Sequence, residues 1–238
     1  MNGGGRSATL LKMARLLVVG LAAAVASTAV AVDGRASGDP KRGLTKADQH
    51  WAKTIVLRTR DLPTGVRWTS YSTGGSGGGA GTTPGCPGSS ENNSDLTETG
   101  AALSPLFLTR NRQFIIASAA WIYKTTRQAR AFVQRIEDGM TRCGAAALKA
   151  EVATTKSAEL VSYGVRSIPG THGWWNYRIV LRIHANGRTI KSFVDMGFGQ
   201  RGRATSWLIL HGAYEPLPAS AEAKLVQLVM ARMAKPPR

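Results

Sequence analysis

The chain of 238 residues is long enough for one domain or a tight pair of domains, and 43% of its residues are hydrophobic. Lysine and arginine outnumber aspartate and glutamate by 31 to 14, which gives a net charge of +17 at pH 7. This charge predicts attraction to anionic surfaces such as phospholipid headgroups or wall polymers, and it does not indicate a specific nucleic-acid partner. After residue 32, no stretch is apolar enough to span a bilayer, which excludes a transmembrane span in the mature chain.

The first 31 residues have the three parts of a secretory signal peptide. A basic region with Arg6, Lys12 and Arg15 precedes an apolar run over 16–32, and Ala29-Val30-Ala31 supplies a cleavage site. The alternative is a retained anchor, because a run of this length lies at the lower limit for a spanning helix. Cleavage removes three cations and no acidic residue, so the net charge of +17 falls by three, to about +14. We expect a secreted or envelope-retained protein.

We expect residues 32–43 to form a flexible tether and residues 44–238 to form a single domain, with a Gly-rich loop at 73–93. The chain has only two cysteines, Cys86 and Cys143. In an exported protein this number predicts one disulfide bond, and the alternative is two free thiols.

Capping residues and apolar periodicity predict the elements of the N-terminal half. Thr45 with Asp48 resembles a capping box and predicts a helix from about 46 to 58. Strands are expected at 66–72, 95–104, 113–124 and 159–167, and both faces of 113–124 are apolar, as in a central strand. Thr125 with Gln128 predicts a second helix, which ends near Cys143 and continues as a short helix over 145–152.

The clearest local signal is the turn Asn186-Gly187, which predicts a hairpin. With these two residues in the turn, Tyr177 faces Met196 and Ile179 faces Val194 on an apolar face. On the other face, Arg178 opposes Asp195 as an ion pair, and Arg182 opposes Lys191 as a like-charge pair.

A further strand is expected over 204–211, and a last helix over 220–233. Helices and strands are thus grouped rather than alternating along the chain. This order predicts an α+β fold in which helices pack on an antiparallel sheet.

No catalytic or metal-binding constellation is visible. His50, His172, His184 and His211 are not spaced as a ligand set, although His184 and His211 could lie near each other across the strands. No nucleophile elbow is present, so we predict no catalytic residue, no metal and no cofactor.

The polar face of the hairpin supplies the candidate ligand-binding residues Arg178, Arg182, His184 and Lys191, with Trp174 beside them. The like-charge pair of Arg182 and Lys191 is unfavourable unless an anion lies between the two side chains. The alternative interpretation is a solvated basic face without a ligand.

Several short motifs resemble those of a known group. They are Asp61-Leu62-Pro63-Thr64-Gly65 after the first helix, the Cys86 loop, Ser94-Asp95-Leu96-Thr97, the Ala129-Arg130-Ala131 helix ending at Cys143, the Tyr177-Arg178 strand and Ala231-Arg232-Met233. The set resembles uncharacterised exported proteins of actinobacteria and, more distantly, the PknH-type extracellular sensor domains and LpqN-type lipoproteins of mycobacteria. The resemblance implies a PsbP-like or sensor-like sandwich and a non-enzymatic role at the cell envelope. The chain has neither a kinase nor a lipobox, and its two cysteines allow only one disulfide, so no functional residue is carried over.

The sequence therefore predicts an exported, non-catalytic binding or sensor-like module of the cell envelope. Its expected partner is an anionic envelope component or an amphipathic small molecule. The alternative is an exported, hydrolase-like enzyme of a type that the motifs do not reveal.

Overall fold

The computed structural model describes residues 39–72, 92–111, 113–154, 157–185 and 187–236. The expected signal peptide, most of the expected tether, Cys86 and Asn186 lie outside the described residues. The strands are β1 (Lys41–Arg42), β2 (Trp68–Tyr71), β3 (Thr97–Leu103), β4 (Leu106–Thr109), β5 (Phe114–Tyr123), β6 (Ala158–Arg166), β7 (Trp174–Ala185), β8 (Arg188–Arg201) and β9 (Ala204–Ala213). The helices are α2 (Lys46–Ile55), α3 (Thr126–Thr154) and α4 (Ala219–Met233), with a short 3₁₀ helix η1 (Thr59–Asp61).

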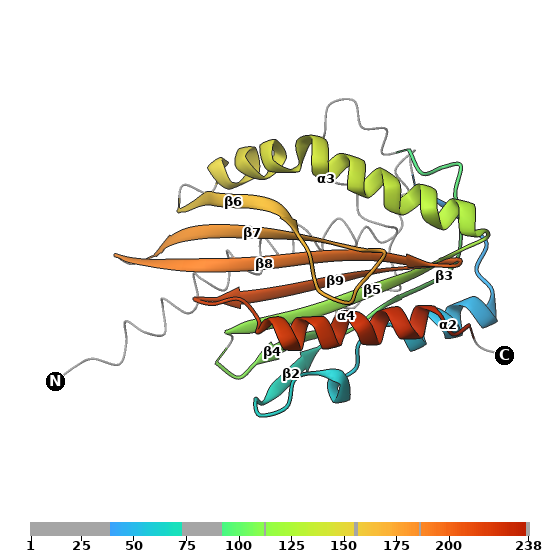
Figure 1. The fold of residues 1–238 in the computed structure, drawn as a ribbon, viewed down its shortest axis with the longest axis horizontal. Coiled ribbons are helices and arrows are strands. Elements are labelled where there is room, and N and C mark those ends of the chain that lie inside the picture. The colour runs from blue at the N-terminus through green and yellow to red at the C-terminus, as the bar shows by residue number, and fades with distance from the viewer. Residues whose placement is uncertain (1–38, 73–91, 112, 155–156, 186, 237–238) are drawn as a thin grey trace.

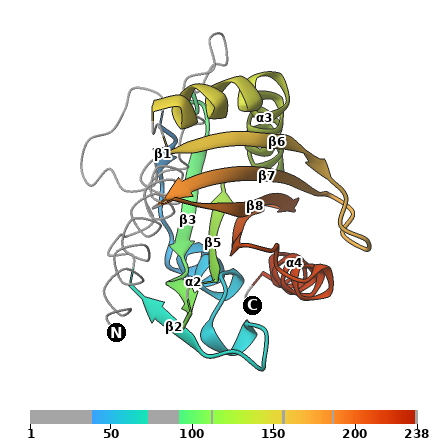
Figure 2. The same ribbon diagram turned by 90° about the vertical axis from the view of Figure 1, so that its left-hand side faces the viewer.

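The described strands form one sheet in the order β1-β3-β5-β9-β8-β7-β6, with β4 pairing β5 and β2 pairing β4. All pairs are antiparallel except β1 with β3. Helix α3 lies on one side of the sheet, and α2 and α4 lie on the other (Figures 1 and 2). This arrangement confirms the predicted α+β class. None of the helices in the described ranges is both long and apolar enough to cross a bilayer.

The predicted register of the β7–β8 hairpin is confirmed. Tyr177 pairs with Met196, Ile179 with Val194, and Arg178 with Asp195. Gly187 has a φ of 72°, which is the left-handed conformation that a two-residue hairpin turn requires. The alternation of apolar and polar residues fixed this register because a shift by one residue would turn every side chain to the wrong face.

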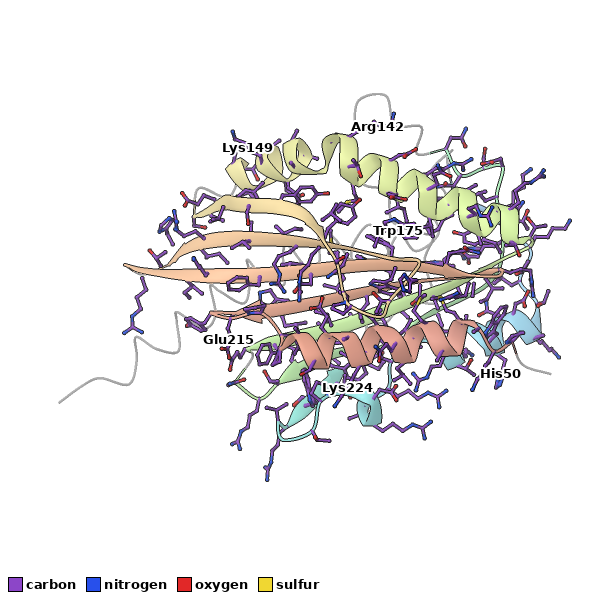
Figure 3. The ribbon with its side chains drawn as sticks, viewed as in Figure 1. His50, Arg142, Lys149, Trp175, Glu215 and Lys224 are labelled. Atoms are coloured by element: carbon purple, nitrogen blue, oxygen red, sulfur yellow. The ribbon has the colours of Figure 1, made fainter. Side chains whose placement is uncertain are left out.

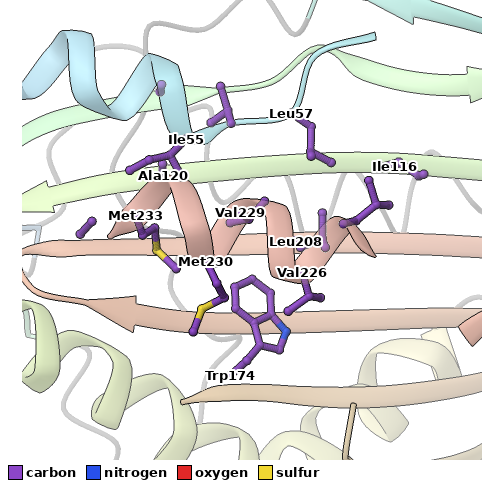
Figure 4. Close-up of a cluster of buried hydrophobic side chains, with 14 of the residues drawn as sticks. Ile55, Leu57, Ile116, Ala120, Trp174, Leu208, Val226, Val229, Met230 and Met233 are labelled. Atoms are coloured by element: carbon purple, nitrogen blue, oxygen red, sulfur yellow. The ribbon is translucent and has the colours of Figure 1, made fainter. Parts of the chain in front are cut away.

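Strand β5 is buried on both faces, as its apolar pattern predicts. On one face Ile116, Ala120 and Ile122 join the core beneath α2 and α4. That core includes Ile55, Leu208, Val229 and Met233 (Figure 4). On the other face Trp121 and Tyr123 pack against Phe132 of α3.

Helix α2 begins as predicted but ends earlier. Thr45 Oγ1 accepts a hydrogen bond from the Asp48 backbone N–H at 3.1 Å. The helix ends at Ile55 rather than near residue 58, because the Leu57 N–H turns to donate to Ser118 Oγ of β5 at 2.8 Å. The helix also lies directly on β3, since a Cβ added to Gly100 would stand 2.3 Å from the Asp48 carbonyl oxygen.

Three further elements differ from the predictions. Helix α3 runs unbroken through Gly144, where two helices were expected. Gly144 is needed there because the Tyr163 hydroxyl lies where a Cβ would stand and donates to the Met140 carbonyl at 2.7 Å. Strand β4 was not predicted, and Lys41–Arg42 of the expected tether form β1, parallel to the start of β3.

Candidate functional site

The hairpin residues predicted to bind a ligand share one face of the sheet, but their side chains have different contacts. Arg178 makes two hydrogen bonds of 2.7 Å to the Asp195 carboxylate. Arg182 forms an ion pair with Glu159 of β6. His184 Nδ1 lies 3.1 Å from Thr189 Oγ1, and the Lys191 side chain is exposed. These contacts do not bring the side chains together around one cavity.

Trp174 lies at the opposite end of β7 from His184 and belongs to the core. It packs flat over Gly197 and Gly199 of β8, where an added Cβ would stand 2.2 Å and 2.3 Å from the indole. It is 9% exposed and contacts the core beneath α4 (Figure 4). The glycines in β8 are therefore explained by the space that this indole needs.

A buried ionic network lies beneath the first turns of α4. Glu222, which is fully buried, accepts hydrogen bonds from Asn176 Nδ2 at 2.8 Å and from Arg166 Nη1 at 2.5 Å. Asp195, 1% exposed, is bound by Arg178 and lies 3.6 Å from Arg166 Nη1. Burial and the nearby Asp195 raise the pKa of Glu222, against the opposing effect of Arg166. Two carboxylates and two guanidinium groups balance each other, so the network has no excess positive charge to attract an anion.

A pocket of about 530 Å³ lies between α2, the segment around η1 and the C-terminal end of α4. Its lining is mainly basic and consists of His50, Thr54, Arg58, Arg60, Leu228, Ala231, Arg232 and Lys235. His50 marks this end of the molecule in Figure 3. A volume of this size suits a small ligand.

One wall of the pocket is held by an ion pair. Arg232 donates to Asp61 Oδ1 at 2.7 Å and to Oδ2 at 2.8 Å, and it also donates to the Val56 carbonyl at 3.2 Å. Burial acts to raise the pKa of Asp61, but the bonds from Arg232 and from the Arg58 backbone N–H outweigh it and hold this pKa below its usual value. The pair fixes α4 against the turn after α2 and neutralises one cation of the pocket.

The remaining cations of the pocket are not neutralised. Arg58, Arg60 and Lys235 are exposed and form no ion pair within the described part of the chain. Leu228 and Ala231 provide an apolar strip along α4 between them. The pocket therefore combines excess positive charge with apolar contact area, which favours an anionic ligand that has an apolar part.

The described residues contain no group of three or more His, Cys, Asp or Glu side chains that could hold a metal ion. His184 and His211 lie on opposite faces of the sheet, since His211 pairs with Val194 on the α3 side. His211 Nε2 lies 2.8 Å from Ser192 Oγ, but both residues are at most 3% exposed. A substrate cannot reach this serine, so the pair does not favour a hydrolase.

The sequence did not reveal the pocket, because its residues come from two segments, 50–60 and 228–235, that are far apart in the chain. Arg58 and Arg60 follow the first helix, whereas Arg232 and Lys235 are near the C-terminus. The one available signal was the motif around Asp61, whose carboxylate holds Arg232.

Comparisons with known proteins show a distant structural likeness. No family model matches the chain, and no curated protein matches it. The extracellular domain of PknH from Mycobacterium tuberculosis is similar with a TM-score of 0.38 and 12% identity, covering 79% of this chain and 100% of that chain. A protein of unknown function from Pseudomonas aeruginosa, PA94, described as a putative regulator, is similar with a TM-score of 0.20 and 16% identity, covering 52% of this chain and 74% of that one. Likeness at this level carries no function from one protein to another.

Proposed function

We propose that the chain is an exported, non-catalytic binding module of the cell envelope, whose basic pocket between α2 and α4 takes an anionic, amphipathic ligand. The observation that carries the proposal is the set of exposed cations Arg58, Arg60 and Lys235 around one pocket of about 530 Å³. The proposal keeps the sensor-like or binding role that the motif resemblance implies, and it moves the site from the β7–β8 hairpin to this pocket.

The types of side chain that line the pocket indicate the chemistry of the ligand. Guanidinium groups bind phosphate and carboxylate oxygens through paired hydrogen bonds, and Lys235 adds a compact positive charge. Leu228 and Ala231 would contact a short apolar chain on the same ligand. Arg232 remains with Asp61, so we assign it a positioning role at the pocket wall.

The pocket is tested by calorimetric titration with dodecyl phosphate and, separately, with inorganic phosphate. Wild type is expected to bind dodecyl phosphate more tightly, because the apolar strip adds contact area. The triple variant Arg58→Ala/Arg60→Ala/Lys235→Ala should bind it at least about tenfold more weakly, because each lost cation removes a charge-assisted interaction.

The matched control removes three cations at the opposite end of the molecule, with Arg110→Ala/Arg188→Ala/Lys191→Ala. These side chains are exposed and lie in the β4–β5 turn and at the β7–β8 hairpin. The control should bind dodecyl phosphate as wild type does. Equal weakening in the two triple variants would show that only the net charge matters, and it would refute a specific pocket.

Because an exported chain enters an oxidising compartment, we predict a disulfide bond between Cys86 and Cys143. Cys143 lies on α3, and Cys86 lies outside the described residues. In the chain-entropy account, a bond across this separation stabilises the fold by roughly 4 kcal/mol. Non-reducing mass spectrometry of the exported chain should find the two cysteines linked and residues 1–31 removed. Two free thiols would speak against an oxidising compartment.

A further inference from the structure

One end of the sheet gathers exposed cations from three stretches of the chain. Lys41 of β1 pairs with Thr97, and the Lys124 N–H, just after β5, donates to the carbonyl of the same Thr97 at 2.9 Å. Arg127 follows in the first turn of α3, and Lys46 begins α2. Arg201 is the last residue of β8 and pairs with Ala204, and this end of β8 lies beside the start of α3 (Figure 1).

We call this surface the basic end and define it by Lys41, Lys46, Lys124, Arg127 and Arg201. All five side chains are exposed, and within the described ranges none of them forms an ion pair. It shares no residue with the pocket of the proposed function.

Most carboxylates at this end are already engaged. Asp48 is bound by both terminal nitrogens of Arg203 at 2.8 and 2.9 Å, and Asp95 is bound by Arg135 at 2.8 Å. Glu98 is 1% exposed, and among the described residues the half-buried Asp39 is the other carboxylate near Lys41 in the sequence. The exposed charge of the basic end is therefore strongly positive.

A large apolar side chain projects from the same surface. Leu44 is 47% exposed, and it lies between Lys41 and Lys46 in the loop that leads from β1 into α2. A hydrated polymer offers no apolar region in which an exposed leucine side chain could be buried. At a bilayer it can enter the acyl boundary while the flanking lysines contact the headgroups.

We propose that the basic end is a docking surface for a bilayer that contains anionic phospholipid. The cations supply electrostatic attraction to the headgroups, and Leu44 supplies a contact that salt does not screen. The described chain enters the domain at this end, at Asp39, and the apolar run over 16–32 precedes it in the sequence.

The test is co-sedimentation of the exported chain, with its N-terminus identified by mass spectrometry. The vesicles contain either phosphatidylcholine with phosphatidylglycerol or phosphatidylcholine alone. Wild type is expected to bind only the anionic vesicles. Lys41→Glu/Lys46→Glu/Lys124→Glu should weaken this binding on the order of 100-fold, given the usual contribution of one basic residue near an anionic membrane.

The control Arg110→Glu/Arg188→Glu/Lys191→Glu makes the same charge change at the far end and should keep most of the binding. Leu44→Asn should cost about tenfold, and the loss should persist at high salt. Each variant is first compared with wild type by thermal unfolding. Equal losses in the two triple variants, or no binding to anionic vesicles, would overturn the proposal.

Binding to a soluble polyanion tests whether the basic end recognises an anionic polymer rather than a bilayer. If polyphosphate binds wild type as strongly as the vesicles do, and Leu44→Asn changes neither interaction, the surface recognises a polymer and the bilayer proposal is wrong. Because the pocket residues are unchanged in these variants, dodecyl phosphate binding reports separately on the proposed function.

Discussion

Replacing Asp195 with alanine is expected to destabilise the protein by about 3 kcal/mol or more. Asp195 is 1% exposed and binds Arg178 through two hydrogen bonds of 2.7 Å. Without it, the guanidinium of Arg178 loses its partner in a half-buried site, and the balance around Glu222 changes. Removing one partner of a buried ion pair typically costs about 3–5 kcal/mol, because the other charge remains.

The matched control is Asp95→Ala. Asp95 forms the same paired contact with Arg135 at 2.8 Å, but its side chain is 59% exposed. An exposed pair contributes about 1 kcal/mol at most, so this variant should unfold nearly as wild type does. Urea unfolding measures both variants. Equal losses for the two would show that burial of the network beneath α4 has no special effect.

Two buried groups are expected to give the free energy of unfolding opposite responses to pH. Burial raises the pKa of Glu98 from 4.5 to about 7, and burial lowers the pKa of His211 from 6.5 to about 4. Both side chains are at most 3% exposed. Each shift corresponds to about 3 kcal/mol at most.

The sign differs because the native state holds the Glu98 proton more tightly and the His211 proton less tightly than the unfolded chain. For Glu98, the unfolded chain releases its proton above pH 4.5, so stability falls as pH rises toward 7. For His211, the unfolded chain takes up a proton below pH 6.5, so stability falls as pH decreases toward 4. In wild type, the fall in stability from Glu98 and the rise from His211 therefore offset each other between pH 4.5 and 6.5.

Single substitutions should separate the two responses in urea unfolding at pH 4.5, 5.5, 6.5 and 7.5. Glu98→Gln should leave the rise in stability between pH 4.5 and 6.5 that His211 produces. His211→Gln should leave the fall between pH 4.5 and 7 that Glu98 produces. Parallel pH profiles for the two variants would show that these groups are not titrating as their burial requires.

The fold was predictable where local patterns have one solution. The β7–β8 register followed from Asn186-Gly187 and strict alternation, and a shift by one residue would have exposed Tyr177 and Ile179. Strand β5 could be predicted as central because both of its faces are apolar. The length of α3 was not predicted, because the contact that allows the helix to run through Gly144 is with the Tyr163 hydroxyl of a separate strand.

The candidate site was less predictable, because it depends on contacts between distant segments. The ion pair of Arg178 with Asp195 was predicted from the hairpin register and is confirmed, but the sequence did not show that Glu159 of β6 pairs with Arg182. The sequence suggested that Trp174 lines a pocket. In the structure its indole instead packs against two glycines of β8. The pocket itself requires α4 to cross α2, which no local pattern specifies.

The central claim is that an anionic, amphipathic ligand binds between α2 and α4, and mapping the binding of dodecyl phosphate by backbone amide NMR tests it most directly. The predicted result is a set of shifted amides centred on His50, Thr54 and Ala231, with Arg178 to Lys191 unchanged. Shifts centred on the β7–β8 hairpin, or no shifts when dodecyl phosphate is added, would contradict it.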